Sequence, residues 1–456
     1  MSEQKLNGAI SVQIPKTDFV PRKYEGPSTA EVVSLRRQYM NPGIFAYYKK
    51  PLMLVEGNGQ YVYDEEGKQY LDTFAGIVTI SVGHCHPKVV AAGQKQLETI
   101  MHTTTIYYNP EVALLAKELI SKMPEGSGLN RVYFTNSGSE ANDLAVLMSR
   151  MYTGAYDMIS LRNGYHGMSE GMRGLTALKN WKFAVPQAFG VHHALNPNRY
   201  RGPFGYDDPD SAHKYANDVK DLIDHATPGK IACYIAECIQ GVGGTVVLPD
   251  GYLKEVYKHV RDAGGLCIAD EVQTGFGRTG THYWGFEGHG VIPDIVVVAK
   301  GMGNGTPIAA VITREDVAMT MKTGLHFNTY GGNPVSCAIA RAVLKIIDEE
   351  NIQQNAYERG EQYMEGLLKL QKKYDFIGDV RGKGLMIGLE MVKDRVTKEP
   401  AVEETLQVME RCRDMGLLIG RGGLLGNVFR IKPPMCISEA DVVFALDVMD
   451  RAFGEL

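Results

Sequence analysis

A lysine stands where a buried strand is expected to end. Residues 295–299 are apolar, and Lys300 follows them directly, before the small-residue run 301–305. A lysine amine that is removed from water loses its proton more easily, and the neutral amine is a nucleophile. The alternative is a lysine whose flexible stem carries its ammonium group to solvent. Lys300 is therefore a candidate nucleophile whose interpretation depends on its neighbours.

Carboxylates follow two other apolar segments. Asp270 comes after residues 266–269, and Glu237 comes after residues 231–236. Ligands of open parallel sheets bind beyond the carboxyl ends of the strands, so both side chains are expected at one edge with Lys300. A protonated heteroaromatic nitrogen is a partner that would keep Asp270 ionised there. The alternative is that Asp270 caps its strand by accepting hydrogen bonds from backbone amides.

Two loops with glycines follow further apolar segments. Ser137, Gly138 and Ser139 come directly before a predicted helix, whose free backbone N–H groups would suit a phosphate. The alternative is an ordinary serine N-cap. Tyr165 lies between glycines after another segment, where its ring can lie flat against a planar ligand. A surface-loop tyrosine is the alternative for that position.

Together these features point to one cofactor. A phosphate site, an aromatic ring, a carboxylate for a ring nitrogen and a lysine amine are the groups that hold pyridoxal phosphate. The glycine run 301–305 is not a dinucleotide site, because its spacing is GxGxG and a strand is expected after it at 307–312. The pair His84 and His86 lacks a nearby third ligand, so no metal site is predicted.

Alternating helices and short apolar strands are expected to position these residues. Strands that are apolar on both faces and are separated by helices predict a mostly parallel sheet that is covered on both sides. The strands are expected at residues 132–135, 158–161, 231–236, 266–269 and 295–299. Helices are expected at residues 28–38, 87–101, 110–123, 139–152, 212–226, 251–263 and 335–350. A hairpin is expected over residues 52–72, with its turn closed by Gly67.

The pattern divides the chain into a central part and two ends. The predicted fold is α/β, with a large doubly wound, mostly parallel sheet domain over residues 85–335. A small α+β domain is expected from both chain ends, residues 41–84 and 336–456. An N-terminal extension and helix, residues 1–40, precede it.

Composition excludes several classes of protein. The 456 residues carry 48 basic and 53 acidic side chains, which gives a net charge of −5 and no basic surface for a nucleic acid. No apolar stretch reaches the ~18 residues that a membrane span needs. The seven cysteines are scattered singly, as is typical of reduced thiols in an intracellular protein. The first 30 residues lack a secretory or Arg-rich presequence, which predicts the cytoplasm; the alternative is the mitochondrial matrix, if a presequence was removed.

The motifs resemble those of class III aminotransferases, which are pyridoxal-phosphate enzymes of fold type I. The resemblance covers nearly the whole chain and rests on long, specific motifs: SGSEAN at 137–142, YHG at 165–167, DEVQTGFGR at 270–278 and KG at 300–301. Within this family the chain is similar to alanine–glyoxylate aminotransferases of the second, β-amino-acid-using type. That similarity rests on residues 76–79, 81–87, 326–334 and 382–388.

The resemblance implies catalytic and cofactor-binding roles. Lys300 would form the Schiff base with pyridoxal phosphate and would then carry a proton, while Asp270 would pair with the pyridine nitrogen. Tyr165 would stack on one face of the ring. The other residues implied to contact the cofactor are Ser137, Gly138, Ser139, His166, Glu237, Val272, Gln273 and Thr329.

Several of these implied roles are specific. Val272 would pack on the second ring face, and Gln273 would reach the ring hydroxyl, oriented by Glu237. Gly138 and Ser139 would bind the phosphate. Thr329 would reach the phosphate of a neighbouring subunit, so the resemblance implies a homodimer with its site at the interface, with a tetramer as the alternative assembly.

The resemblance also implies substrate contacts. Arg430 matches the family's carboxylate-binding arginine, whose planar fork suits bidentate recognition; without the resemblance it would be a surface arginine on a small-domain strand. Tyr47 and Val78 are expected to line the pocket. Relatives that use ω-amino acids often carry a glutamate that masks this arginine, but Val242 occupies that place here. The difference favours substrates that carry carboxylates in both half-reactions.

The implied reaction is a ping-pong transamination. Alanine, a small β-amino acid or a related amine would donate nitrogen to a 2-oxo acid such as glyoxylate or pyruvate. One alternative is an aminomutase or lyase on the same scaffold. Another is a non-catalytic binding protein of the same fold, against which the intact Lys300, Asp270 and Tyr165 argue.

Overall fold

The computed structural model describes residues 13–456. Residues 1–12 lie outside the described residues, and so does the first part of the predicted N-terminal extension. The predicted short helix is present as α1 (Thr29–Tyr39), where the Ser28 hydroxyl accepts a hydrogen bond from the amide of Glu31.

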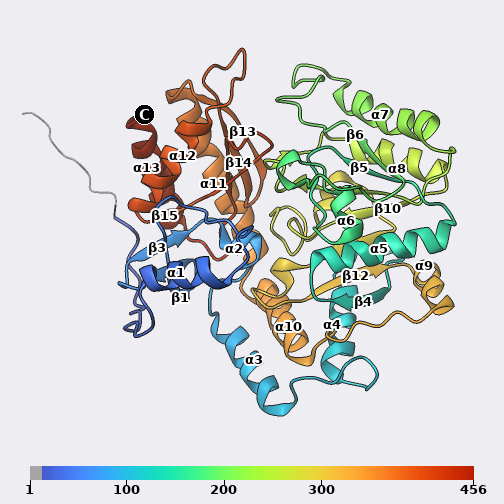
Figure 1. Ribbon diagram of the computed structural model, residues 1–456, viewed down its shortest axis with the longest axis horizontal. Helices are drawn as coiled ribbons and strands as arrows, with labels where there is room; N and C mark the ends of the chain where they lie inside the picture. Colours follow the sequence, from blue (N-terminus) through green and yellow to red (C-terminus); the bar gives the residue numbers. More distant parts are fainter. Residues whose placement is uncertain (1–12) are drawn as a thin grey trace, which may run out of the picture.

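A seven-stranded sheet forms the larger part of the molecule (Figure 1), in the order β4-β12-β11-β10-β7-β5-β6. Its strands are β4 (Arg131–Thr135), β5 (Met158–Leu161), β6 (Val191–Ala194), β7 (Cys233–Glu237), β10 (Leu266–Asp270), β11 (Ile295–Val298) and β12 (Ala309–Thr313). The pairs from β11 to β6 are parallel, and only β12 runs antiparallel to its neighbours β11 and β4. The predicted mostly parallel sheet is confirmed. Strand β6 was not predicted, because two histidines interrupt its apolar character.

Helices cover both faces of this sheet. Ile268 of β10 packs in one cluster with Leu144 of α5 (Gly138–Thr153). The neighbouring residue Cys267 belongs to a second hydrophobic cluster, which includes residues of α7 (Ser211–Ala226) and α8 (Tyr252–Asp262) such as Val256. Successive side chains of a strand point to opposite faces, so a continuous apolar run fills both layers. The doubly wound arrangement is confirmed.

Strands from both chain ends combine in the smaller part. The strands β1 (Leu54–Asn58), β2 (Tyr61–Asp64) and β3 (Gln69–Asp72) form an antiparallel meander, and β15 (Leu417–Leu418) adds to β3 in parallel. Gly67 closes the β2–β3 turn with a φ of +79°. Figure 1 shows these blue strands beside the red C-terminal helices. The domain boundaries stay a prediction.

A second four-stranded sheet holds the C-terminal residues of the site. Its order is β13-β14-β17-β16, with β13 (Ile377–Lys383), β14 (Met386–Met391), β17 (Val428–Ile431) and β16 (Gly420–Gly422). The helices around it are α11 (Ile352–Lys373), α12 (Val402–Asp414) and α13 (Glu439–Gly454). The remaining helices and strands are α2 (Ala75–Val78), α3 (Pro87–Thr99), α4 (Pro110–Ile120), α6 (Glu170–Leu175), α9 (Glu315–Met319), α10 (Pro334–Glu349), β8 (Ile239–Gln240) and β9 (Val246–Val247). Within residues 13–456, none of the helices has the length and apolar character needed to cross a bilayer.

Candidate active site

Lys300 follows β11 and begins a short 3-10 turn with a strained backbone. Its φ is +44°, in the left-handed region that residues with a Cβ rarely adopt. The turn is fixed from outside, because the Ser81 hydroxyl donates a 2.6 Å hydrogen bond to the carbonyl of Gly301. Strain of this kind persists only where surrounding contacts determine it, and it is concentrated at functional sites.

The surroundings of Lys300 lower the pKa of its amine. Burial lowers the pKa of Lys300 to about 8, and Arg430 acts in the same direction, while the carboxylates of Asp270 and Glu237 oppose the change. These four charged groups come from β11, β17, β10 and β7, so the structure brings together side chains that are far apart in the sequence. At a pKa of 8, about a tenth of the amine is unprotonated at pH 7.

Asp270 is held at the end of β10 by two buried side chains. Its Oδ2 accepts hydrogen bonds from Nδ1 of His166 at 2.8 Å and from Nδ2 of Asn142 at 2.9 Å. Among residues 13–456, the second oxygen, Oδ1, accepts only the amide of Val272, at 3.2 Å. Asp270 is therefore not mainly a cap for backbone amides. His166, predicted to bind cofactor, lies behind Asp270, and Asn142 is a residue to which the sequence analysis gave no role.

The predicted phosphate loop lies where β4, β5 and β10 end. The Ser137 hydroxyl accepts the amide of Glu140 at 3.3 Å, so Ser137 does act as an N-cap. A Cβ on Gly138 would lie 3.1 Å from a methyl group of Val272, and one on Gly167 would lie 2.7 Å from Cβ of Ser139. Both glycines are needed for this close approach of three loops.

Glu237 and Gln273 have different partners from those expected. The carboxylate of Glu237 accepts the amides of Tyr165 at 3.0 Å and of Gly241 at 2.7 Å, and burial raises its pKa. Oε1 of Gln273 instead accepts a 3.2 Å hydrogen bond from Nζ of Lys432. The expected contact between Glu237 and Gln273 is not among the hydrogen bonds of residues 13–456. Glu237 thus anchors the loop that carries Tyr165.

Arg430 is a buried arginine with free hydrogen-bond donors. It is 4% exposed, and within the described part of the chain its Nε and one terminal nitrogen have no partner. Its guanidinium carbon lies 5.2 Å from the ring centroid of Phe74, and Tyr47 stacks against Phe74 at 5.5 Å. A buried guanidinium with unused donors is costly unless an anion joins it. Tyr47 is thus close to the predicted anion site, as expected for a pocket residue.

Val78 belongs to an unusual turn that directly follows Phe74 in the chain. The four residues of α2 all have positive φ values, 54° at Ala75, 58° at Gly76 and 64° at both Ile77 and Val78. Val78 itself is 2% exposed and packs with Ile239 and Met386, so its side chain faces the interior. A left-handed turn with two β-branched residues is strained, and its place next to Phe74 associates that strain with the site.

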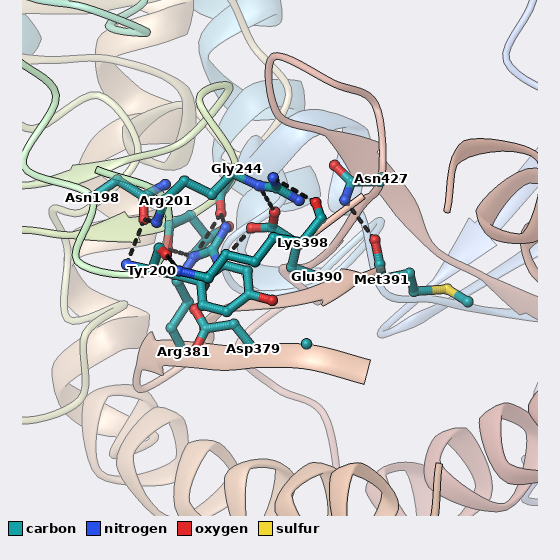
Figure 2. A network of polar contacts seen from close by, with 12 residues as sticks. Asn198, Tyr200, Arg201, Gly244, Asp379, Arg381, Glu390, Met391, Lys398 and Asn427 are labelled. Atoms are coloured by element: carbon teal, nitrogen blue, oxygen red, sulfur yellow. Dashed lines mark hydrogen bonds and ion pairs between the residues drawn. The ribbon is translucent and has the colours of Figure 1, made fainter. Parts of the chain in front are cut away.

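A buried ion-pair network supports the turn that carries Val242. Arg381 pairs with Glu390 at 2.8 Å and with Asp379 at 2.7 Å, and it donates to the carbonyl of Gly244 at 2.7 Å. Figure 2 shows this arginine between the carboxylates and the turn. The carbonyl of Val242 accepts the amide of Gly423 at 3.0 Å. The network therefore fixes turn 241–245 against the sheet that carries Arg430.

Thr329 lies next to a residue that contacts both flanks of the predicted phosphate loop of the same chain. It lies in an exposed segment, and no hydrogen bond of its hydroxyl occurs among residues 13–456. Its neighbour Asn328 donates to Glu140 at 3.2 Å and accepts from Asn136 at 2.9 Å. Thr329 is exposed in the single chain. Its expected action on a neighbouring subunit stays a prediction.

The assembled side chains fit pyridoxal phosphate. Nε2 of His166 and Oδ1 of Asn142 are buried without a partner within the described residues, directly behind Asp270, and the donors of Arg430 are unused. A nucleophilic amine, a carboxylate and a glycine-lined helix start are present together, as that cofactor requires. No group of three or more histidine, cysteine, aspartate or glutamate side chains in residues 13–456 is placed to bind a metal ion.

Comparison with known proteins gives the same family over nearly the whole chain. The family model "Aminotransferase class-III" matches residues 45–453. "Alanine--glyoxylate aminotransferase 2 homolog 2, mitochondrial" of Arabidopsis thaliana is 48% identical, covering 99% of this chain and 93% of the relative. "Alanine--glyoxylate aminotransferase 2, mitochondrial" of Homo sapiens is 44% identical, covering 100% and 92%.

Solved structures of similar fold include an amine transaminase and a phospholyase. An amine transaminase from an uncultivated Pseudomonas species, in its PLP-bound form, has a TM-score of 0.86 and 31% identity, covering 92% of this chain and 98% of that one. A phospholyase from Arthrobacter, in complex with phosphoethanolamine, has a TM-score of 0.87 and 33% identity, covering 93% and 100%. The chain therefore belongs to the class-III aminotransferase family.

Proposed function

We propose that this aminotransferase moves an amino group from alanine or a small β-amino acid to glyoxylate or pyruvate. The observation that carries the proposal is that the buried Arg430, whose hydrogen-bond donors are unused in residues 13–456, lies near enough to Lys300 to act on its pKa. An amino-acid donor and a 2-oxo acid both present a carboxylate to such an arginine. The names of the relatives from Arabidopsis thaliana and Homo sapiens support alanine and glyoxylate.

The residues divide the chemistry among them. Bound pyridoxal phosphate supplies a ring that takes up the electron pair released at the substrate α-carbon. Asp270, held by His166 and Asn142, would keep the pyridine nitrogen protonated. Arg430 would hold the substrate carboxylate. Nζ of Lys300 would accept the proton of the substrate α-carbon and would deliver it to the C4′ carbon of the cofactor. Orientation by Arg430 decides which substrate bond Lys300 can reach.

The remaining predicted contacts form the walls of the cofactor site. We assign the phosphate to the start of α5, where the backbone N–H groups of Gly138 and Ser139 have no acceptor within their own helix, with Ser137 shaping the turn. Tyr165 would cover one ring face, backed edge-on by Trp181 at 5.1 Å, and Val272 the other.

Steady-state kinetics test the proposed reaction. Rates are measured for a panel of amino donors, including alanine and small β-amino acids, with glyoxylate or pyruvate as acceptor. A ping-pong transaminase gives parallel double-reciprocal lines when the acceptor concentration is changed. Ammonia release without an acceptor would instead support a lyase, a reaction that the name of the Arthrobacter relative brings into view.

Val242 is expected to leave Arg430 open to carboxylates. In the variant Val242→Glu, the new carboxylate should pair with Arg430 and compete with substrate. The KM for pyruvate and glyoxylate should rise about tenfold or more, equivalent to about 1.4 kcal/mol. Val242→Gln is the matched control, since it adds similar volume without charge and should change KM much less. Equal KM values for Val242→Glu and the wild type would show that Val242 does not border the carboxylate site.

We also propose that the active unit is a homodimer. Large apolar side chains are exposed on two segments that meet, since the His102 ring lies 5.3 Å from that of Tyr330. The exposed side chains are Leu97, Ile100, Met101, Ile106, Tyr107, Tyr108, Leu325, Phe327 and Tyr330. A patch of this kind is typical of a protein interface. Thr329 lies inside it, which supports the idea that one subunit completes the phosphate site of the other.

Mixed dimers test the placement of Thr329. The variants Thr329→Asp and Lys300→Ala should each be inactive alone, the first because a carboxylate repels the phosphate. Co-expressed in equal amounts, they should recover activity at about a quarter of the sites, because half of a random dimer population is mixed and each mixed dimer has one intact site. No recovery in mixed dimers that have been separated by affinity tags would place Thr329 in its own subunit's site. Activity of Thr329→Asp alone would place Thr329 outside both sites.

The names of the two relatives support the mitochondrial alternative over the predicted cytoplasmic location. We propose a mitochondrial enzyme on that ground. Fractionation of cells that produce the native protein would test it directly.

A further inference from the structure

Lys432 is a buried lysine that the sequence analysis did not single out. It follows β17 by one residue and has no exposed surface. Its backbone amide donates to the carbonyl of Thr73 at 2.8 Å, which fixes the end of the strand. Alternate residues of a strand share a face, so Lys432 and Arg430 point to the same side of β17.

The amine of Lys432 has polar but uncharged hydrogen-bond partners. Nζ donates to Oε1 of Gln273 at 3.2 Å and to the carbonyl of Gly241 at 3.4 Å. No ion pair of Lys432 occurs within residues 13–456. The charged groups that face it are Arg430 on the same strand, Glu237 of β7, Lys300 after β11 and Arg278 after β10.

These surroundings disfavour an ammonium group. Burying a charge without a close counter-charge is costly, and three of the four facing groups are cations. Burial lowers the pKa of Lys432 well below its usual value, and Arg430 acts in the same direction. In either protonation state the Lys432 amine has N–H groups to donate.

The contact with Lys432 determines which way the Gln273 carboxamide faces. Oε1 of Gln273 accepts the hydrogen bond from Lys432. The amide nitrogen Nε2 therefore points the other way, and within the described residues it has no hydrogen-bond partner. Gly241 allows this arrangement, since a Cβ at that position would overlap the carboxamide. Gln273 is the residue expected at the ring hydroxyl of the cofactor.

We propose that Lys432 is a positioning residue for Gln273, whose amine keeps Nε2 of the carboxamide directed toward the ring hydroxyl of pyridoxal phosphate. This inference rests on the cofactor and on the expected role of Gln273 in the proposed function. A donor at that place stabilises the ionised hydroxyl. Without Lys432 the carboxamide is free to turn and to present its oxygen, which repels the same group.

The test is a spectrophotometric pH titration of the holoenzyme. The absorbance of the bound cofactor is followed for the wild type and for Lys432→Met, which preserves volume and removes the donor. Because the ionised ring oxygen loses a donor, the protonated form of the chromophore persists to higher pH. The midpoint should rise by about one pH unit, equivalent to about 1.4 kcal/mol.

Three further variants separate positioning from a structural role. Gln273→Leu should raise the midpoint by a similar amount. In the double variant the midpoint should be close to that of Gln273→Leu alone, because the effects of two residues that act through one contact do not add. Lys432→Arg keeps a donor and should not raise the midpoint. Lys393→Met is the control, because Lys393 is exposed and pairs with the exposed Glu399; its midpoint should equal that of the wild type.

Several results would overturn the proposal. They are an unchanged midpoint in Lys432→Met, full additivity with Gln273→Leu, or a midpoint in Lys432→Arg that rises as far as in Gln273→Leu. The last comparison holds even if Lys432→Met does not fold. Titration requires only bound cofactor, so an enzyme that failed to transfer amino groups would still report on Lys432, and the two failures are distinguishable.

Discussion

Replacing Lys300 by alanine is expected to abolish amino transfer in both half-reactions. The variant loses an amine that interacts electrostatically with Asp270, Glu237 and Arg430 and whose pKa burial lowers to about 8. Loss of both a nucleophile and a proton carrier should reduce the rate by at least about 10⁴-fold, equivalent to about 5.5 kcal/mol of activation free energy. Pyruvate formed from alanine and glycine formed from glyoxylate measure the two half-reactions separately.

Two controls accompany this variant. Lys369→Ala removes an exposed lysine that pairs with Glu365, and it should retain wild-type activity. Lys300→Arg keeps a cation but has no neutral amine at neutral pH, so it should be as inactive as the alanine variant. Turnover by purified Lys300→Ala within tenfold of the wild type would contradict the assigned role.

Asp270→Asn is expected to have the second largest effect. The amide cannot hold a protonated pyridine nitrogen, and it no longer gives His166 and Asn142 a charged acceptor. We expect the rate at saturating donor to fall about 10³-fold, equivalent to about 4 kcal/mol. Single-turnover kinetics of alanine with the cofactor-loaded variant measure this rate without product release.

The conservative variant sharpens that result. Asp270→Glu keeps the charge in a longer side chain and should recover part of the lost rate, whereas a purely structural role would make both substitutions equally harmful. A rate for Asp270→Asn within tenfold of the wild type would show that the ring nitrogen does not depend on this carboxylate.

The sequence was informative where a local pattern determines a position. Apolar runs predicted the parallel strands, and the residues that end them, Asp270 and Lys300, lie at the carboxyl edge as expected. The two serines and the glycine at 137–139 predicted the start of α5 correctly. These features depend on residues that are near in sequence, which is why pattern analysis could find them.

Other parts of the site depend on contacts between distant segments. Nothing around Asn142 or Lys432 predicts that one reaches Asp270 and the other Gln273, since both contacts arise only when the strands assemble. The left-handed turn at Ile77 and Val78 opposes the usual preference of β-branched residues, so local propensity predicts the wrong conformation there. Glu237 was expected to contact Gln273, whereas the hydrogen-bond partner of Gln273 is Lys432. The family pattern does not reveal which buried group lies nearest to a given side chain.

One measurement tests the central claim most directly. The cofactor-loaded enzyme is mixed with alanine in the absence of any acceptor, and pyruvate and ammonia are quantified. A transaminase should release about one pyruvate per subunit and no ammonia, and then stop, because the nitrogen stays on the enzyme. Adding glyoxylate should then yield an equal amount of glycine. Continued pyruvate formation with ammonia, or no pyruvate from any donor in the panel, would contradict the account.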